Sequence, residues 1–129
     1  MEKFSLARTT RTPLPRIPFK RIKEFVVGKK MSVTLIFIGE QRSRELNMKT
    51  RKKEGTANIL TFPLSKESGE IYITPSRTKR DAQEFGLSHR EFLVFLFIHG
   101  LLHLKGVSHG STMERKEEEL FKKVKKIFI

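Results

Sequence analysis

Apolar residues along this chain follow two different periods, which together predict a series of strands and helices. Strands are predicted where β-branched and aromatic residues are concentrated or alternate with polar ones. They cover residues 3–8, 33–38, 59–64 and 70–74. Helices are predicted where apolar residues recur every three to four positions, or where a capping pattern opens a charged segment. They cover residues 19–27, 41–49, 75–85, 88–104 and 111 to the C-terminal end.

Local signals mark several of these boundaries. Gly28 follows a helical pattern, at a position where glycine readily adopts the left-handed conformation that ends a helix. Ser88 with Glu91, and Ser111 with Glu114, have the Ser-x-x-Glu spacing of a capping box. We therefore expect one helix to begin at each of these two serines.

The predicted order of elements is β-α-β-α-β-β-α-α-α, which indicates an α+β or mixed α/β fold. We expect a single small mixed β-sheet of about four strands covered by helices, in one domain over residues 1–129. The segment 92–98, FLVFLFI, is apolar on every face of its helix. A helix that is apolar all round is buried, so the helix over 88–104 should lie at the centre of the core.

The composition adds a strong positive charge, because 27 Lys and Arg stand against 14 Asp and Glu and the net charge is +13. Such an excess favours a polyanionic partner. The basic residues are spread along the chain, which favours a nucleic acid over a membrane surface. Cysteine is absent, so any metal must be held by His or carboxylate ligands. No N-terminal targeting segment is visible, so a cytoplasmic protein without membrane association is expected.

Histidines form the strongest chemical signal, in the segment HGLLHLKGVSH at residues 99–109. His99 and His103 are spaced i, i+4 on one helix, so both imidazoles reach one metal ion. Gly106 lies where the helix should end, which lets the chain turn back and bring in His109. Three histidines and one water are the ligands of a catalytic rather than a structural zinc site, and such a water has a pKa of about 7.

Two other interpretations of these histidines remain open. Histidines at a helix end are also favoured by the helix dipole, without any metal. The spacing also matches the HExxHxxGxxH segment of metzincin proteases, in which the glutamate is the general base. Gly100 occupies the position of that glutamate, so a metzincin-like protease is the weaker alternative.

Several segments together resemble the YbeY family of bacterial rRNA maturation endoribonucleases. HGLLHLKGVSH is similar to the family signature HGxLHLxGYDH. LNMKTRKKEGTANILTFPL at residues 46–64 is similar to LNxxYRxxDxPTDVLSFP. The segments 4–11, 69–71 and 113–120 are similar to the opening strand, the GDI element and the acidic C-terminal helix of that family.

The resemblance implies a zinc-dependent endoribonuclease, specific for single strands, which matures the 3′ end of small-subunit rRNA and acts in ribosome quality control. It makes His99, His103 and His109 the zinc ligands and gives Arg51 a catalytic role. A guanidinium suits that role because it binds phosphate through two parallel hydrogen bonds. Arg51 is expected in a loop over 51–55, and single-stranded rRNA and the small ribosomal subunit are the expected partners.

The chain departs from the family pattern at several positions within these segments. Ser108 replaces an Asp, Val107 and Thr50 each replace a Tyr, Asn58 replaces an Asp, and Glu54 or a neighbour stands in for the Asp of the loop. None of these changes removes an expected metal ligand. Because Ser108 replaces a carboxylate next to His109, a non-catalytic zinc-containing ribosome assembly factor is a further alternative. The oligomeric state is not predicted by the sequence.

Overall fold

The computed structural model describes residues 3–107 and 110–129. Along these residues the elements follow the predicted order of strands and helices. The strands are β1 (Phe4–Arg8), β2 (Ser32–Phe37), β3 (Ile59–Ser65) and β4 (Ser68–Ile73). The helices are α1 (Phe19–Val27), α2 (Glu40–Arg51), α3 (Pro75–Glu84), α4 (His89–Leu104) and α5 (Ser111–Phe128).

The strands of the described residues form one mixed four-stranded sheet in the order β1-β2-β4-β3. β1 pairs with β2, and β2 with β4, in parallel, whereas β3 and β4 form an antiparallel hairpin. The predicted mixed sheet is therefore confirmed. β1 and β3 are the two edge strands, and β3 is the one that faces the site described below.

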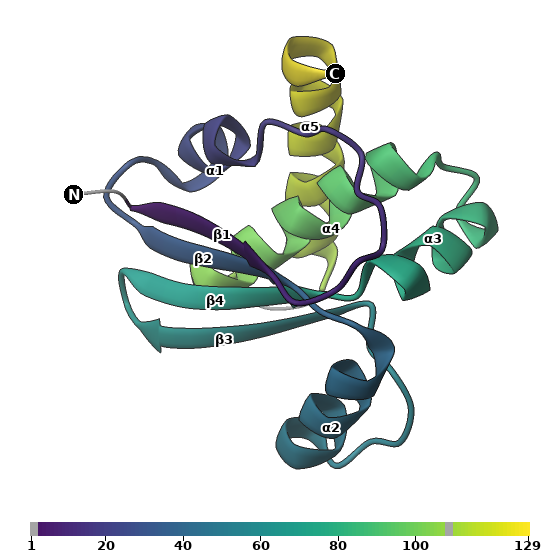
Figure 1. Ribbon diagram of the computed structural model, residues 1–129. Helices are drawn as coiled ribbons and strands as arrows, with labels where there is room; N and C mark the ends of the chain where they lie inside the picture. The colour runs from purple at the N-terminus through teal and green to yellow at the C-terminus, as the bar shows by residue number, and fades with distance from the viewer. Residues whose placement is uncertain (1–2, 108–109) are drawn as a thin grey trace.

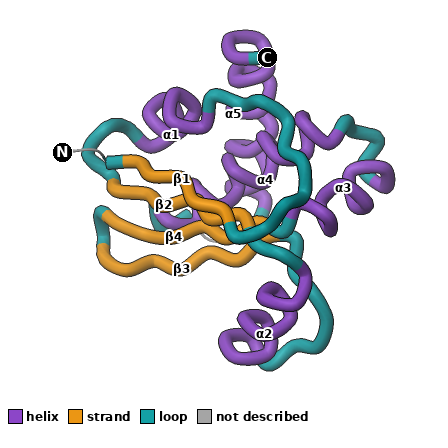
Figure 2. The backbone as a smooth tube through the Cα atoms, viewed as in Figure 1, coloured by secondary structure: helices purple, strands orange, loops and turns teal. Residues whose placement is uncertain are grey.

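Helices cover the two faces of the sheet unequally. Figure 1 shows α1, α4 and α5 together on one face, whereas α2 projects beyond the other face. Figure 2 shows the long loop between β1 and α1, whose Leu14 and Ile17 pack against the main core. On the opposite face, Leu46 of α2 packs with Leu60 of β3 in a smaller apolar cluster.

α4 is the central helix, as its uniformly apolar sequence predicts. Phe97 and Leu101, for example, have no exposed surface, and α4 contacts α1, α3, α5, β3 and β4. Its N-terminus has a complete capping box: the Ser88 hydroxyl accepts from the Glu91 N–H and the Glu91 carboxylate accepts from the Ser88 N–H, both at 3.0 Å. Among the described residues no single helix is long and apolar enough to cross a membrane, although α3 and α4, bent by 105°, pass that test of length and composition as a pair.

One predicted helix end and one predicted helix cap are wrong. α2 extends through Arg51, which is therefore the last helical residue and not part of a loop over 51–55. It ends there because Lys52 adopts the left-handed conformation, with φ 57° and ψ 34°. α5 begins at Ser111, but its N-cap is Gly110, so the hydroxyl of Ser111 lies one position too late to cap the helix.

Candidate metal centre and nucleic-acid cleft

The C-terminal half of α4 carries His99 and His103 one turn apart. Their Nε2 atoms are 3.1 Å apart, their ring centroids are 4.6 Å apart, and the ring planes are inclined by 75°. Both residues are half-buried. The structure thus brings the two imidazoles together with the same ring nitrogen of each pointing to a common position, as the i, i+4 spacing predicts.

This arrangement fits two ligands of a tetrahedral metal ion. Two nitrogen ligands at about 2.0–2.1 Å from zinc lie about 3.3 Å apart, close to the separation of the Nε2 atoms of His99 and His103. His109, the third expected ligand, and Ser108 lie outside the described residues. Accordingly, the described part of the chain contains no group of three or more His, Cys, Asp or Glu side chains placed to hold a metal ion.

A buried carboxylate from α5 lies behind the histidine pair. Glu117 is 7% exposed, and its Oε1 is hydrogen-bonded to Nδ1 of His99. The hydrogen bond therefore engages the ring nitrogen of His99 that points away from His103. A carboxylate on the distal nitrogen of a histidine is the usual outer partner of a metal-binding imidazole.

The two histidines open into a cleft of about 670 Å³. The cleft follows the free edge of β3, with α4 on one side and the C-terminal end of α2 on the other. Its lining residues are Thr50, Arg51, Asn58, Ile59, Leu60, Thr61, Phe62, His99 and His103. Arg51 and the histidine pair, which are far apart in the sequence, therefore share one cavity.

Arg51 is placed to bind an anion in this cleft. It is exposed, and within the part of the chain that the structure describes no hydrogen bond or ion pair engages its guanidinium. A guanidinium presents five N–H donors in a planar fork that matches a phosphate. Its donors are thus available to a ligand that also reaches the histidines.

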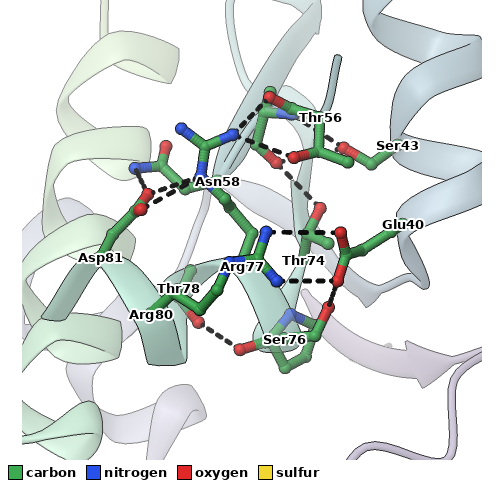
Figure 3. Close-up of polar contacts among 12 residues, drawn as sticks. Glu40, Ser43, Thr56, Asn58, Thr74, Ser76, Arg77, Thr78, Arg80 and Asp81 are labelled. Carbon is green, nitrogen blue, oxygen red and sulfur yellow. Dashed lines mark hydrogen bonds and ion pairs between the residues drawn. The ribbon is translucent and has the colours of Figure 1, made fainter.

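A polar cluster fixes the segment between α2 and β3, which forms part of the cleft wall (Figure 3). The Arg77 guanidinium donates to both oxygens of Asp81, at 2.9 and 3.1 Å, and to the carbonyl and hydroxyl oxygens of Thr56, at 2.8 and 2.9 Å. Asp81 also accepts from the Asn58 side-chain amide at 3.2 Å. Asp81 of α3 thereby holds Asn58, a residue of the cleft wall, and Arg77 of α3 holds Thr56, two positions before it.

The N-terminal end of α2 is also tied to α3. Glu40 accepts from the Ser76 hydroxyl at 2.7 Å and from the Arg80 guanidinium at 3.1 and 3.3 Å (Figure 3). The hydrogen bonds from Arg80 and then from Ser76 lower the pKa of Glu40 below its ordinary value. The hydroxyl of buried Ser43 also donates to the Ala57 carbonyl. Together these contacts hold α2 against the rest of the fold.

Gly100 lies at the interface between α4 and the sheet. A Cβ atom there would meet Ile59 Cδ1 and Ile71 Cδ1 at 3.1 Å and Thr61 Cγ2 at 3.2 Å. This position therefore faces the sheet and has no room for a larger side chain. In the metzincin pattern it carries the catalytic glutamate, so the fold provides no place for that base.

Two further residues with ionisable side chains, His89 and Glu70, lie away from the cleft. His89, at the start of α4, is half-buried and its Nε2 is 2.8 Å from the Thr78 hydroxyl. Burial, and then the charge of Lys79, lower the pKa of His89 below its ordinary value. Glu70 is on β4 and accepts a hydrogen bond from Tyr72 at 3.3 Å, on the sheet face turned away from α4. Neither residue lines the cleft.

The family model described as Endoribonuclease YbeY matches residues 13–129 of the chain. This chain belongs to the YbeY family. Among curated relatives, the Endoribonuclease YbeY of Thermotoga sp. is 38% identical over 96 residues, which cover 73% of this chain and 63% of the relative. That of Campylobacter jejuni is 36% identical, covering 68% of this chain and 72% of the relative. That of Spiroplasma citri is 30% identical, covering 84% and 77%.

A solved structure supports the same fold. The solution structure of TM1509 from Thermotoga maritima matches this YbeY-family chain with a TM-score of 0.67 and 25% identity. The match covers 94% of this chain and 88% of the other. In sequence, the aligned part of this chain spans 63% of the length of each of the Thermotoga relatives that it matches.

Two features of the site do not follow from the sequence motifs alone. No sequence motif points to Glu117, although its position offers a signal: it lies one turn from Met113 on the apolar stripe of α5. A charged residue on such a stripe needs a buried partner. The contact of Arg77 with Thr56 has no comparable signal, because it joins residues that are distant in sequence and unrelated in pattern.

Proposed function

We propose that this YbeY-family protein is a metal-dependent endoribonuclease that cleaves single-stranded RNA in the cleft beside β3. His99, His103 and His109 would hold one zinc ion, and Arg51 would bind the phosphate next to the bond that is cleaved. The observation that carries the proposal is that the histidine pair and Arg51 line one cavity. The endoribonuclease relatives and the +13 net charge support an RNA substrate.

Each residue would contribute a distinct function. Zinc, when bound, would polarise a phosphodiester oxygen and make water nucleophilic at neutral pH. His99 and His103 would present their Nε2 atoms to the ion, and Glu117 lies against the other ring nitrogen of His99. Arg51 would hold the phosphate and stabilise the negative charge that develops on it. The contacts of Arg77 and Asp81 would keep the wall carrying Asn58 in place.

The cleft geometry favours a single strand as the substrate. The cavity follows one edge strand and is bounded by two helices, and an extended chain fits such a channel without unpairing. We further propose that the natural substrate is the 3′ end of small-subunit rRNA, with the small ribosomal subunit as partner in the cytoplasm. This part of the proposal is supported by the family resemblance of the motifs around residues 46–64 and 99–109.

A metzincin-like protease is not favoured by this geometry, since Gly100 faces the sheet and leaves no space for the catalytic glutamate. A non-catalytic ribosome assembly factor has one specific observation in its favour, the replacement of the family Asp by Ser108. The endoribonuclease and the non-catalytic assembly factor differ in one expected result. Both predict RNA binding that weakens with salt, but only the nuclease predicts cleavage.

The deciding experiment measures cleavage of a single-stranded ribosomal 3′-end fragment and of the same sequence as a duplex, together with the metal content of each protein. We expect wild type to cleave the single strand, and His103→Ala to lose both metal and cleavage. Arg51→Ala should retain the metal and lose about 100-fold in rate, the usual effect of removing one charge-stabilising donor.

Arg44→Ala is the matched control for Arg51. Arg44 is an exposed arginine on the same helix, and it is not among the residues that line the cleft. Its removal changes the net charge equally, so a rate within about threefold of wild type is expected. Cleavage that persists in His103→Ala would contradict the metal-dependent mechanism. Wild type that binds metal and RNA without cleaving it would support the assembly factor instead.

A further inference from the structure

The most unusual charged group near the site is the carboxylate of Glu117. It lies on the buried side of α5, on the same stripe as Met113 and Val124, which are 2% and 0% exposed. Burial of a carboxylate costs several kcal/mol unless it is paired and hydrogen-bonded. Its hydrogen-bond partner in the structure is Nδ1 of His99. A core position that an apolar residue could fill is therefore occupied by a group that contacts a candidate metal ligand.

This contact links the carboxylate to the tautomer of the imidazole. A carboxylate in its ionised form only accepts hydrogen bonds, and its contact with His99 then requires the proton of the imidazole to be on Nδ1. The proton on Nδ1 leaves the lone pair on Nε2, the nitrogen that is 3.1 Å from Nε2 of His103. Without such a partner a neutral imidazole exchanges between two tautomers, and only one of them presents Nε2 to a metal.

The neighbouring carboxylates of α5 have a different environment. Glu114 and Glu118 are exposed, and neither has a side-chain hydrogen bond or ion pair within the part of the chain that the structure describes. Glu118 is adjacent to Glu117 in sequence but lies on the solvent side of the helix. α5 therefore directs one of these three carboxylates toward His99, and Glu118 offers a matched comparison.

We propose that Glu117 is a positioning residue that holds His99 in the tautomer and orientation needed for metal binding, and so couples the docking of α5 to the metal centre. This inference rests on the proposed metal site of His99 and His103. Outer partners of metal-binding histidines change metal affinity by about 10–100-fold when they are mutated. Glu117 should therefore alter zinc affinity without contacting the ion or the RNA.

The first test is a competition titration of zinc against a chelator, using the full chain and variants checked for native circular dichroism. Glu117→Gln keeps the size and one acceptor oxygen but removes the charge, and we expect zinc binding to weaken by about tenfold. Glu117→Ala removes the acceptor, and a loss of up to about 100-fold is expected. Glu118→Gln, which removes the same charge from the solvent side, should leave the zinc affinity within about twofold.

The second test is the imidazole spectrum of the metal-free protein, which distinguishes a proton on Nδ1 from one on Nε2. We expect His99 to be protonated at Nδ1 in wild type and in Glu118→Gln, and to populate both tautomers in Glu117→Ala. Zinc affinity that is equal in wild type and Glu117→Gln, or a His99 tautomer that does not respond to Glu117→Ala, would overturn the inference. A purely structural role would lower the melting temperature without changing either measurement.

These tests also separate the inference from the function on which it rests. Wild type that binds no zinc would overturn the metal site and the proposed function, whatever the Glu117 variants do. Wild type that binds zinc with the same affinity as both Glu117 variants would overturn only the positioning role. If Glu117→Ala does not fold, Glu117→Gln alone decides the result, because it preserves the volume of the side chain.

Discussion

Gly100 provides a direct test of how α4 meets the sheet. In Gly100→Ala, the new Cβ would lie 3.1 Å from Ile59 Cδ1 and from Ile71 Cδ1, closer than ordinary van der Waals contact. Overpacking of this kind costs about 1–3 kcal/mol. Replacing a helical glycine by alanine recovers up to about 1 kcal/mol. We therefore expect a net loss of about 1 kcal/mol in the free energy of unfolding.

Gly100→Glu should have a much larger effect. Its carboxylate would have to enter the same apolar contact with Ile59 and Ile71, where the effective cost of an unpaired charge is several kcal/mol. Together with overpacking, the loss should be at least about 4 kcal/mol. A small domain has only about 5–15 kcal/mol in total, so this variant should be largely destabilised. Although the substitution completes the sequence HExxHxxGxxH, we expect no peptide cleavage.

The assay is urea unfolding at neutral pH, followed by circular dichroism, with peptide cleavage measured on the folded fraction. Arg90→Glu is the control, because Arg90 is exposed in the first turn of the same helix and a change within about 0.5 kcal/mol is expected there. Gly100→Glu with an unfolding free energy within about 1 kcal/mol of wild type would refute the placement of this residue against the sheet. Stabilisation by Gly100→Ala would refute the tight contact.

Three further predictions concern the polar contacts and the metal. Arg77→Ala should lower the unfolding free energy by about 1–2 kcal/mol in urea, because Asp81 and Thr56 lose a charged donor, whereas exposed Lys79→Ala should change it by less than about 0.5 kcal/mol. The pKa of His89 is lower in the folded state, so the free energy of unfolding decreases as pH falls through the unfolded pKa of about 6.5. His89→Asn should reduce that decrease between pH 7 and 5. The same pH profile of stability in wild type and variant would contradict this prediction. Zinc at about 100 times its Kd should stabilise wild type by about 2.7 kcal/mol in thermal melts, and a similar gain in His103→Ala would exclude the histidine site.

The helices and strands could be predicted from the sequence wherever one local signal was decisive. α1 has the predicted bounds, 19–27, because its apolar stripe is closed by Gly28, which adopts φ 89°. α4 begins as predicted because both halves of the Ser88–Glu91 capping box form. The prediction failed at the end of α2 and at the cap of α5. In both places the boundary depends on backbone conformation at one residue, Lys52 or Gly110, that composition does not specify.

Some features of the candidate site could likewise be predicted from local sequence signals, and others could not. The pairing of His99 and His103 could be predicted because residues spaced i, i+4 on a helix share one face. Burial of this helix could also be predicted, because residues 92–98 are apolar on every side. The role of His109 stays a prediction, since that residue lies outside the described part of the chain.

Tertiary structure alone decided which distant residues meet. The strand order β1-β2-β4-β3 makes β3 an edge, so that a cleft forms beside it, and the docking of α2 brings Arg51 to the same cleft as the histidines. The packing of α5 on α4 brings Glu117 to His99, a contact between residues 18 positions apart. The physical reason is that periodicity and capping act over one or two helical turns, whereas these contacts depend on how separate elements fill a shared core.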